Sequence, residues 1–327
     1  MKRREFISLI CGATLPLPGV ARAQIGKVPR VGVLWHAASA AAQGAYYTAL
    51  VQGFRDLGYS DGHNIVLEHR FASEMPEQFR SMAAELVALN VDVLVTVGPQ
   101  TAPYAKDATT TIPVVFMGVP DPVGSNYVDS FARPGRNMTG LSNFGIDIVL
   151  KRLQFLKYIR EDLSRVALLV NPNNRLASLY KRVTQAAAAE LGLENHTFEA
   201  RSVDELEHVF DTMVEAGMQA VTINADGLAY QHRSLIGKLT LARRLPLGVW
   251  SRETFDGGAL MSYGPDQVAM CRHAPVLVDK ILKGTKPGDL PVEQPVKLEL
   301  FINLRIARTM GFSVPPTLLA LADDVVE

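Results

Sequence analysis

Short runs of consecutive apolar residues alternate along the chain with longer segments whose apolar residues recur every three or four positions. In the first half, the apolar runs cover residues 30–35, 64–71, 91–97 and 113–117. The helical spacing between these runs covers residues 46–57, 77–89 and 101–108. Unbroken apolar strands joined by helices are typical of a parallel sheet that is buried on both faces. The first half is therefore predicted to form a doubly wound α/β lobe.

The same alternation restarts after a loop rich in Gly, Pro and Asn at residues 133–137. The strands expected in the second half cover residues 165–170, 195–199, 220–223, 247–250 and 259–263. The helices expected there cover residues 149–158, 177–191, 203–216, 232–243 and 266–283. The chain is expected to end with a crossing strand at 291–295, a closing strand at 296–302 and a short helix. The pattern predicts an α/β fold of two Rossmann-like, doubly wound parallel-sheet lobes.

Two lobes of this kind also predict where a ligand would bind. Ligands of doubly wound sheets lie outside the carboxyl ends of the strands. If two lobes face each other, these ends line the cleft from both sides. Residues that directly follow predicted strands are therefore the candidates for a binding site.

Length and charge narrow the class of protein. The chain has 327 residues, of which 48% are hydrophobic and 20% charged, and this length is enough for two domains. Its 33 Lys and Arg residues balance its 33 Asp and Glu residues. A protein that binds nucleic acid needs a basic surface to displace counterions, so the balance argues against a nucleic-acid partner.

The first 23 residues have the pattern of an export signal. Basic residues precede an apolar stretch from Phe6 to Val20, and Ala21-Arg22-Ala23 fits a signal-peptidase site. We expect a signal peptide over residues 1–23, cleavage after Ala23 and a periplasmic mature protein. Arg3-Arg4 also fits the twin-arginine route, but Lys2 stands where Ser or Thr is usual, so the route stays open. An uncleaved membrane anchor is the alternative interpretation.

The mature chain is expected to contain neither a disulfide nor a membrane span. Cys11 would leave with the signal peptide, which leaves Cys271 alone. No later segment has 18 uninterrupted apolar residues, so no transmembrane segment is predicted in the mature chain.

Motifs for metal, phosphate and nucleophilic chemistry are absent from the sequence. The seven His include no pair at helical spacing, and the cysteines form no CxxC motif, so no metal site is predicted. The G-x-S-x-x-G run at residues 140–145 is one residue too long for an esterase elbow. No G-x-G-x-x-G follows the first strand, and Gly237-Lys238 lacks the Ser or Thr of a phosphate loop. We therefore expect no cofactor and no catalytic residues, which favours a binding protein over an enzyme.

The candidate binding residues of the first lobe lie in two loops that follow predicted strands. Gly98, Pro99, Gln100 and Thr101 connect one strand to a helix, and Asp121 follows the next strand. Free N–H groups at a helix start suit a carboxylate, and Thr101 could add a hydroxyl. Asp121 could accept hydrogen bonds from a ligand amine. The alternatives are an ordinary Gly-Pro turn with an N-cap and a turn-forming Asp.

The second lobe offers polar residues at strand ends together with aromatic residues. The candidates are Asn143, Phe144, Asn171, Asn224, Asp226 and Trp250. Asn and Asp are also common turn residues, so each has a purely structural alternative. Trp35 and Trp250 each end a strand, one in each lobe, so both rings could line one cleft and stack on a planar ligand or attract a cation. Packing of either ring at the rim or in a core is the alternative.

Several runs, taken together, resemble one known family. They are Asp92-Val93-Leu94-Val95, Thr111-Ile112-Pro113-Val114-Val115-Phe116, Asp121-Pro122-Val123-Gly124, the run at 132–140, Ala259-Leu260-Met261-Ser262-Tyr263-Gly264-Pro265-Asp266 and Leu290-Pro291-Val292-Glu293-Gln294-Pro295. With Arg3-Arg4-Glu5-Phe6, they resemble the ABC-transporter substrate-binding family, which includes tryptophan- and tyrosine-binding members. The resemblance covers nearly the whole chain.

The resemblance implies a type I periplasmic-binding-protein fold, with two lobes joined by a hinge of three crossings. The crossings would lie near 141–142, 263–264 and 292–293. Lobe one would comprise residues 24–142 and 265–292, and lobe two would comprise residues 143–264 and 293–327. The likeness implies ligand contacts from the turn at 98–101 and Asp121 in lobe one, and from Asn143, Asn224 and Trp250 in lobe two. It does not identify the ligand.

Three functions follow from these observations. The leading hypothesis is an exported solute-binding subunit of an ABC importer, which closes on a small carboxylate-bearing ligand of amino-acid or aromatic character. Its partners would be an ABC permease and the ATPase of that permease. A periplasmic ligand sensor for a receptor kinase would have the same sequence features. An exported α/β enzyme would need a convergent acid–base pair in the cleft, for instance Asp121 with Glu253.

Overall fold

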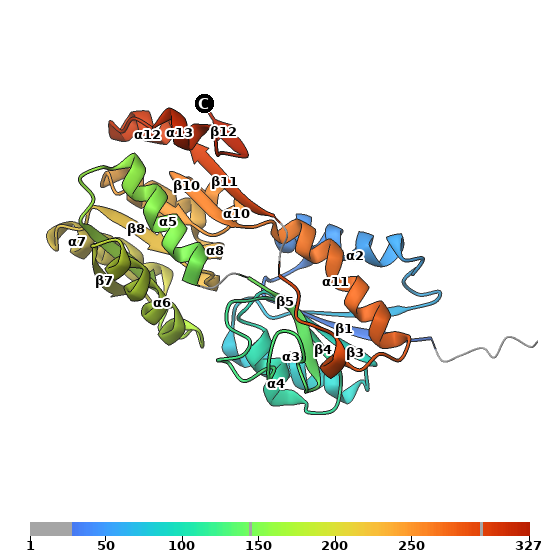
Figure 1. Cartoon of the computed structure of the whole chain (residues 1–327). Coiled ribbons are helices and arrows are strands. Elements are labelled where there is room, and N and C mark those ends of the chain that lie inside the picture. The colour runs from blue at the N-terminus through green and yellow to red at the C-terminus, as the bar shows by residue number, and fades with distance from the viewer. Residues whose placement is uncertain (1–27, 144–145, 295–296) are drawn as a thin grey trace, which may run out of the picture.

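The computed structural model describes residues 28–143, 146–294 and 297–327, and within these ranges the chain forms two separate β-sheets. The strand order is β2-β1-β3-β4-β5 in one sheet and β12-β11-β10-β9-β8-β6-β7 in the other. Helices cover both sheets, which produces the two lobes visible in Figure 1. The predicted α/β class with two parallel-sheet lobes is confirmed. The predicted signal peptide at residues 1–23 and the candidate Phe144 lie outside the described residues.

Lobe one combines the sheet of the first half with a helix from late in the sequence. Its strands are β1 (Arg30–Trp35), β2 (Val66–Phe71), β3 (Val93–Val97), β4 (Val114–Val119) and β5 (Met138–Ser142), and neighbouring strands are parallel. Its helices are α1 (Ala40–Gln43), α2 (Ala45–Asp56), α3 (Pro76–Ala88), α4 (Ala102–Ala108), α11 (Gln267–Leu282) and the 3₁₀ turn η1 (Pro287–Asp289).

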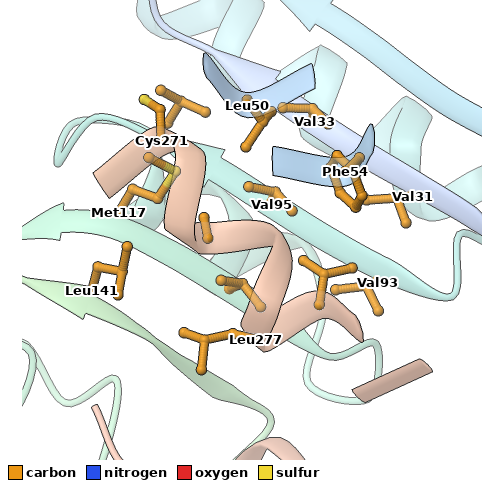
Figure 2. Close-up of a cluster of buried hydrophobic side chains, with 14 of the residues drawn as sticks. Val31, Val33, Leu50, Phe54, Val93, Val95, Met117, Leu141, Cys271 and Leu277 are labelled. Carbon is orange, nitrogen blue, oxygen red and sulfur yellow. The ribbon is translucent and has the colours of Figure 1, made fainter. Parts of the chain in front are cut away.

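One of the two core clusters of lobe one fills the layer between its sheet and the helices α2 and α11, and the other lies on the opposite face of the sheet, against α3 and α4. Side chains of a strand alternate between its two faces, so every second residue of β1 and β3 enters this layer. The helices approach closely at Gly53, where a Cβ atom would lie 2.2 Å from the carbonyl oxygen of Arg272. Figure 2 shows this cluster, which includes Val31, Val33, Leu50, Phe54, Val93, Val95, Met117, Leu141, Cys271 and Leu277.

Lobe two carries the larger sheet. Its strands are β6 (Arg165–Val170), β7 (Glu194–Glu199), β8 (Ala220–Ile223), β9 (Leu247–Val249), β10 (Met261–Pro265), β11 (Leu298–Asn303) and β12 (Asp324–Val326). Its helices are α5 (Ile146–Ile159), α6 (Ala177–Glu190), α7 (Val203–Glu215), α8 (Gly227–Gln231), α9 (Arg233–Ala242), α10 (Arg252–Asp256), α12 (Leu304–Met310) and α13 (Pro316–Leu319). Neighbouring strands are parallel except β10 and β11, which are antiparallel. The chain leaves this lobe at the carboxyl end of β10 and re-enters beside it, so β11 must run in the opposite direction.

The lobes are linked after β5, after β10 and before β11, and two of these links are joined through the backbone. Leu141 and Glu293 form an isolated parallel bridge. The N–H of Ser142 donates to the carbonyl oxygen of Glu293 at 2.9 Å, and the N–H of Glu293 donates to the carbonyl oxygen of Gly140 at 2.9 Å. The strand predicted at 291–295 is wrong in extent, because residues 291–294 show only this bridge.

Other differences from the predicted elements have local causes. The predicted helix at 232–243 is divided into α8 and α9 at His232. Strand β5 was missed because it contains Gly140 and follows a loop with Pro and Gly. At this position a Cβ atom would lie 2.0 Å from the carbonyl oxygen of Phe116, so only glycine allows β5 to pack beside β4. None of the helices in the described ranges combines the length and apolar composition that a membrane crossing requires.

Candidate ligand-binding site

A cavity of about 390 Å³ lies between the two lobes. Its walls include Val97 at the end of β3, Gly118 near the end of β4, Asn224 directly after β8 and Trp250 directly after β9. The carboxyl ends of parallel strands from both sheets therefore meet at one cavity, which is the position expected for a ligand of doubly wound sheets. Its volume suits a small molecule.

Most of the predicted binding residues line this cavity. They are Gly98, Pro99, Gln100, Asp121, Asn143, Asn224, Asp226 and Trp250. The structure thus brings together side chains from five loops that are far apart in sequence. Their contact with a ligand stays a prediction.

The prediction that Trp35 lines the cleft is wrong. Its side chain is 0% exposed and belongs to the core beneath α2. The ring is stacked on Phe71 with centroids 5.9 Å apart, and its Nε1 donates to Nδ1 of His69 at 3.0 Å. Since strand side chains alternate, position 35 shares the face of the core residues Val31 and Val33. The end of the strand reaches the cleft, but this side chain points away from it.

Thr101 and Asn171 also lie outside the cavity lining. Thr101 is buried, and its Oγ1 donates to the carbonyl oxygen of Gly98 at 2.7 Å. The Oδ1 of Asn171 accepts the N–H of Asn173 at 2.9 Å in the turn that follows β6. Each of these side chains therefore stabilises its own loop, and that of Thr101 does so without capping α4.

Gln100 is oriented by an acidic side chain of its own lobe. Its Nε2 donates to both carboxylate oxygens of Glu74, at 3.3 and 3.2 Å, and Nδ1 of His36 lies 2.5 Å from Oε1 of Glu74. The Oε1 of Gln100 is buried and has no hydrogen-bond partner among the described residues. Gln100 thus lines the cavity and has one buried acceptor that the described residues do not use.

Asp121 and Asn143 shape the loops around the cavity. The Oδ1 of Asp121 accepts the N–H of Gly124 at 2.7 Å, which closes a turn. The Nδ2 of Asn143 donates to the carbonyl oxygen of Gly118 at 3.0 Å, beside an irregular position in β4. Both side chains therefore support the backbone of the wall that they line.

Asp226 is buried in the wall of lobe two, at the N-cap of α8. Its Oδ1 accepts the N–H of Ala229 at 3.1 Å, and its Oδ2 accepts from Nδ2 of Asn174 at 3.0 Å. Burial raises the pKa of Asp226 to about 6, although the hydrogen bonds from Asn174 and Ala229 act to lower it. This carboxyl group holds the loop after β8 in position.

Sequence reasoning missed a buried cationic group of the wall, Arg152 in α5. Its side chain is 2% exposed. Nη1 donates to the carbonyl oxygen of Ile223 and to Oδ1 of Asn224, both at 3.1 Å, and Nη2 donates to the carbonyl oxygen of Tyr263 at 3.2 Å. Burial lowers the pKa of the Arg152 guanidinium to about 10.

A sequence signal for Arg152 does exist. Residues 149, 152, 153 and 156 lie on one face of a helix, and the other three are apolar. A single charged residue on an otherwise apolar helix face is unusual unless it has a buried partner or a function.

The rest of the wall is mainly apolar or aromatic and carried no signal that separates it from a core. These residues include Tyr46, Met117, Phe131, Ile148, Val149, Leu179, Tyr180, Val183, Tyr230 and Cys271. Met117 and Cys271 also belong to the core cluster of Figure 2, so the floor of the cavity is continuous with the core of lobe one.

The lobes touch each other beside the cavity. The hydroxyl of Tyr46 in α2 donates to the carboxylate of Glu253 in α10. Nη1 of Arg175 lies 2.7 Å from Oδ2 of Asp107, which belongs to the other lobe. These contacts can form only when the lobes are close together, so the structure represents a closed arrangement.

Asp121 and Glu253, the example given for the acid–base pair of an enzyme, do not line the same pocket. Asp121 lines the main cavity, whereas Glu253 is engaged by Tyr46 and lines a small neighbouring pocket. In the described ranges, no cluster of three or more His, Cys, Asp and Glu residues has the arrangement of a metal site.

Two α/β lobes that close over a cavity at their strand ends define the class of hinged, two-lobed binding proteins. The chain belongs to the ABC transporter substrate-binding protein family, whose sequence model matches residues 31–326. Family membership implies a small-molecule ligand and a transporter partner. The predicted family is confirmed.

Known relatives show how widely this architecture is shared. The chain is 24% identical over 261 residues to the tyrosine-binding protein of Clostridioides difficile (strain R20291), which covers 77% of this chain and 72% of that protein. A conserved domain protein from Vibrio cholerae O1 biovar eltor has 26% identity and a TM-score of 0.84, covering 91% of this chain and 100% of that one. An ABC domain from Streptococcus pneumonia in complex with L-Trp has 22% identity and a TM-score of 0.84, covering 92% and 100% of the two chains.

Proposed function

We propose that the protein is the exported solute-binding subunit of an ABC importer. It captures a small carboxylate-bearing ligand of aromatic or amino-acid character and delivers it to a membrane permease with its ATPase. The observation that carries this proposal is the cavity of about 390 Å³, whose walls come from both lobes. The names of two similar proteins, a tyrosine-binding protein and a complex with L-Trp, support an aromatic amino acid as ligand.

The chemistry of the wall supports the same class of ligand. Trp250, Phe131 and Met117 offer apolar and aromatic surface to a ring, whereas Gln100 and Arg152 offer hydrogen-bonding groups. An apolar wall with a few polar groups binds the body of a ligand by burial and orients it through its polar ends.

Binding is coupled to hinge closure. The described residues of lobe one, 28–142 and 265–292, move as one unit, and the described residues of lobe two, 143, 146–264, 293–294 and 297–327, move as the other. A ligand contacts both lobes only when they are closed, so its binding shifts the equilibrium toward the closed form. The permease then recognises the closed shape, and no covalent step is required.

The site of action follows from the amino terminus. Residues 1–23 direct export and are removed after Ala23, which places the binding protein in the periplasm. Export in the folded state through the twin-arginine route fits Arg3-Arg4.

The proposal is tested with purified protein from which bound ligand is removed by unfolding and refolding. Tryptophan fluorescence and melting temperature are followed against amino acids, aromatic acids, dicarboxylates, sugars and purines. A saturable response to aromatic amino acids is expected, and its loss in Trp250→Ala would place the ligand in the cavity. Saturable binding of a sugar or purine alone would contradict the proposed ligand class. Consumption of any compound in the same samples would contradict a binding protein without catalysis.

Transport is tested separately in cells. Deletion of the gene is expected to abolish uptake of the radiolabelled ligand at low concentration, and restoration of the gene should recover it. Uptake that is unchanged, together with ligand-dependent changes in gene expression, would favour the receptor-kinase sensor instead.

A further inference from the structure

Arg152 presents a buried positive charge for which the described part of the protein supplies no negative partner. Its guanidinium donates to the two backbone carbonyls of Ile223 and Tyr263 and to the amide oxygen of Asn224. All three acceptors are neutral. The ionisable group that acts on its pKa is the phenol of Tyr180, whose own pKa is raised by burial, so this phenol stays uncharged.

The protein treats its other shielded arginines differently. The side chain of Arg243 is 15% exposed and lies 2.7 Å from a carboxylate oxygen of Asp211. The side chain of Arg160 is 20% exposed and lies 3.2 Å from a carboxylate oxygen of Asp162. Arg152 is buried more deeply than either and has no such pair among the described residues. An unpaired buried charge costs several kcal/mol, so its presence in a wall calls for a partner that arrives from outside.

The hydrogen bonds of Arg152 leave room for that partner. A guanidinium has five N–H donors, and three of them are used by the protein. The Nε is buried and has no hydrogen-bond partner among the residues that the structure describes. The three neutral acceptors fix the plane of the guanidinium, so its free donors are already oriented before a ligand binds. A planar, rigid set of donors is the arrangement that suits a carboxylate.

The carboxyl group of Asp226, in the same wall, does not supply the negative partner for Arg152. Asp226 lines the cavity, but its two oxygens accept from Ala229 and Asn174. It forms no ion pair with Arg152 within the described structure. The exposed Arg182 is a second cation at the cavity, but it faces solvent and has no need of a buried partner.

We propose that Arg152 is the anion-recognition residue of the cavity and pairs with the carboxylate of the bound ligand. This inference rests on the proposed function and deepens it, because it selects monocarboxylates against neutral molecules of the same shape. Pairing would satisfy the Nε–H group and neutralise the buried charge in one step. Ligand affinity would therefore depend strongly on the carboxylate and weakly on which aromatic or apolar group follows it.

The test compares acids with matched amides in three proteins. L-tryptophan and L-tryptophanamide, and benzoate and benzamide, are titrated into the wild-type protein, Arg152→Met and Arg182→Met, with melting temperature and calorimetry as readouts. We expect wild type to prefer each acid over its amide by at least about 30-fold, since loss of one partner of a buried ion pair has an effect of this size. Arg152→Met should abolish this preference and change amide binding less than about threefold. Arg152→Lys, which keeps the charge but not the planar fork, should retain part of the preference.

Each result has one meaning. If acids and amides bind equally to wild type, or if Arg182→Met and not Arg152→Met removes the preference, the role of Arg152 is refuted. If benzoate stabilises the protein through Arg152 but L-tryptophan does not bind, the anion site stands and the proposed aromatic amino-acid ligand fails. If Arg152→Met does not fold, as judged by circular dichroism, the comparison of wild type with Arg152→Lys decides. Equal acid preference in those two proteins would then overturn the inference, because a compact ammonium group cannot replace the fork.

Discussion

Asp226→Asn isolates the free-energy cost of burying one carboxyl group in the wall of the cavity. Asp226 is 6% exposed, and burial raises its pKa from the ordinary 3.8 to about 6. Between these two pH values the folded protein keeps a proton that the unfolded chain has released. The stability that this group contributes therefore falls as pH rises from about 4 to 6 and stays low above 6.

The size of this effect follows from the two pKa values. One pKa unit corresponds to about 1.4 kcal/mol, so ionised Asp226 destabilises the fold by about 3 kcal/mol at neutral pH. Asparagine keeps an oxygen that can accept from Ala229 and carries no charge at any pH. The free energy of unfolding of Asp226→Asn, relative to wild type, should therefore rise by about 2 kcal/mol between pH 4 and pH 7, because the unfolded carboxyl group is already partly ionised at pH 4.

The assay is urea unfolding of both ligand-free proteins, followed by circular dichroism at pH 4, 5, 6 and 7. Other titrating groups are common to both proteins, so they cancel in the difference. Asn174→Ala removes a hydrogen bond that lowers the pKa of Asp226, so it should move the transition to higher pH. A difference between wild type and Asp226→Asn that is flat from pH 4 to 7, or that falls, would refute the reasoning.

Three further changes test the site and the fold. The fluorescence change on ligand binding should disappear in Trp250→Phe and persist in Trp35→Phe, because Trp250 lines the cavity and Trp35 does not. The opposite result would contradict this placement of the two rings. Tyr46→Phe removes the hydrogen bond to Glu253, which exists only in the closed form, so ligand affinity measured by calorimetry should fall about 10-fold. An unchanged affinity would mean that this hydrogen bond does not support closure. Gly53→Ala should lower the free energy of unfolding by about 1–3 kcal/mol, because the new Cβ atom would lie 2.2 Å from the carbonyl oxygen of Arg272. An unchanged urea midpoint would show that α2 and α11 can move apart at little cost in free energy.

The sequence predicted the layers of the fold well because these layers depend on apolar spacing. The unbroken runs at 91–97 and 165–170 became β3 and β6, which are buried and have a neighbouring strand on each side. Prediction failed for β5, a strand that forms because of its packing against the neighbouring strand β4 and not because of its own apolar pattern. β5 must have glycine at position 140, because the backbone of Phe116 in β4 leaves no room for a Cβ atom there. The sequence around Gly140 does not reveal this contact.

The sequence located the candidate site residues that directly follow a predicted strand, because such positions lie at the ligand-binding edge of the sheet. Asn224 and Trp250 directly follow strands, so the rule for strand ends located them at the cavity. Trp35 shows the limit of that rule, because the alternation of β1 decides which way its ring points. Arg152 lies inside a helix and does not follow a strand in the sequence, although it contacts the end of β8 in space, so only its charge on an apolar face could have revealed it.

The hydrogen bonds of the wall distinguish two kinds of residue, those that hold the loops of the cavity in place and those that keep polar groups for a ligand. Asp121 and Asp226 both accept backbone N–H groups, and they hold loops in place. By contrast, Nε of Arg152 and Oε1 of Gln100 are buried and lack partners in the described structure. One is a cationic donor from lobe two, and the other is a neutral acceptor from lobe one. A ligand with a carboxylate at one end and an N–H donor at the other would satisfy both groups only when the lobes are closed. An amino acid has these two ends on one carbon atom, so under the proposed function its selection would depend on closure of the lobes.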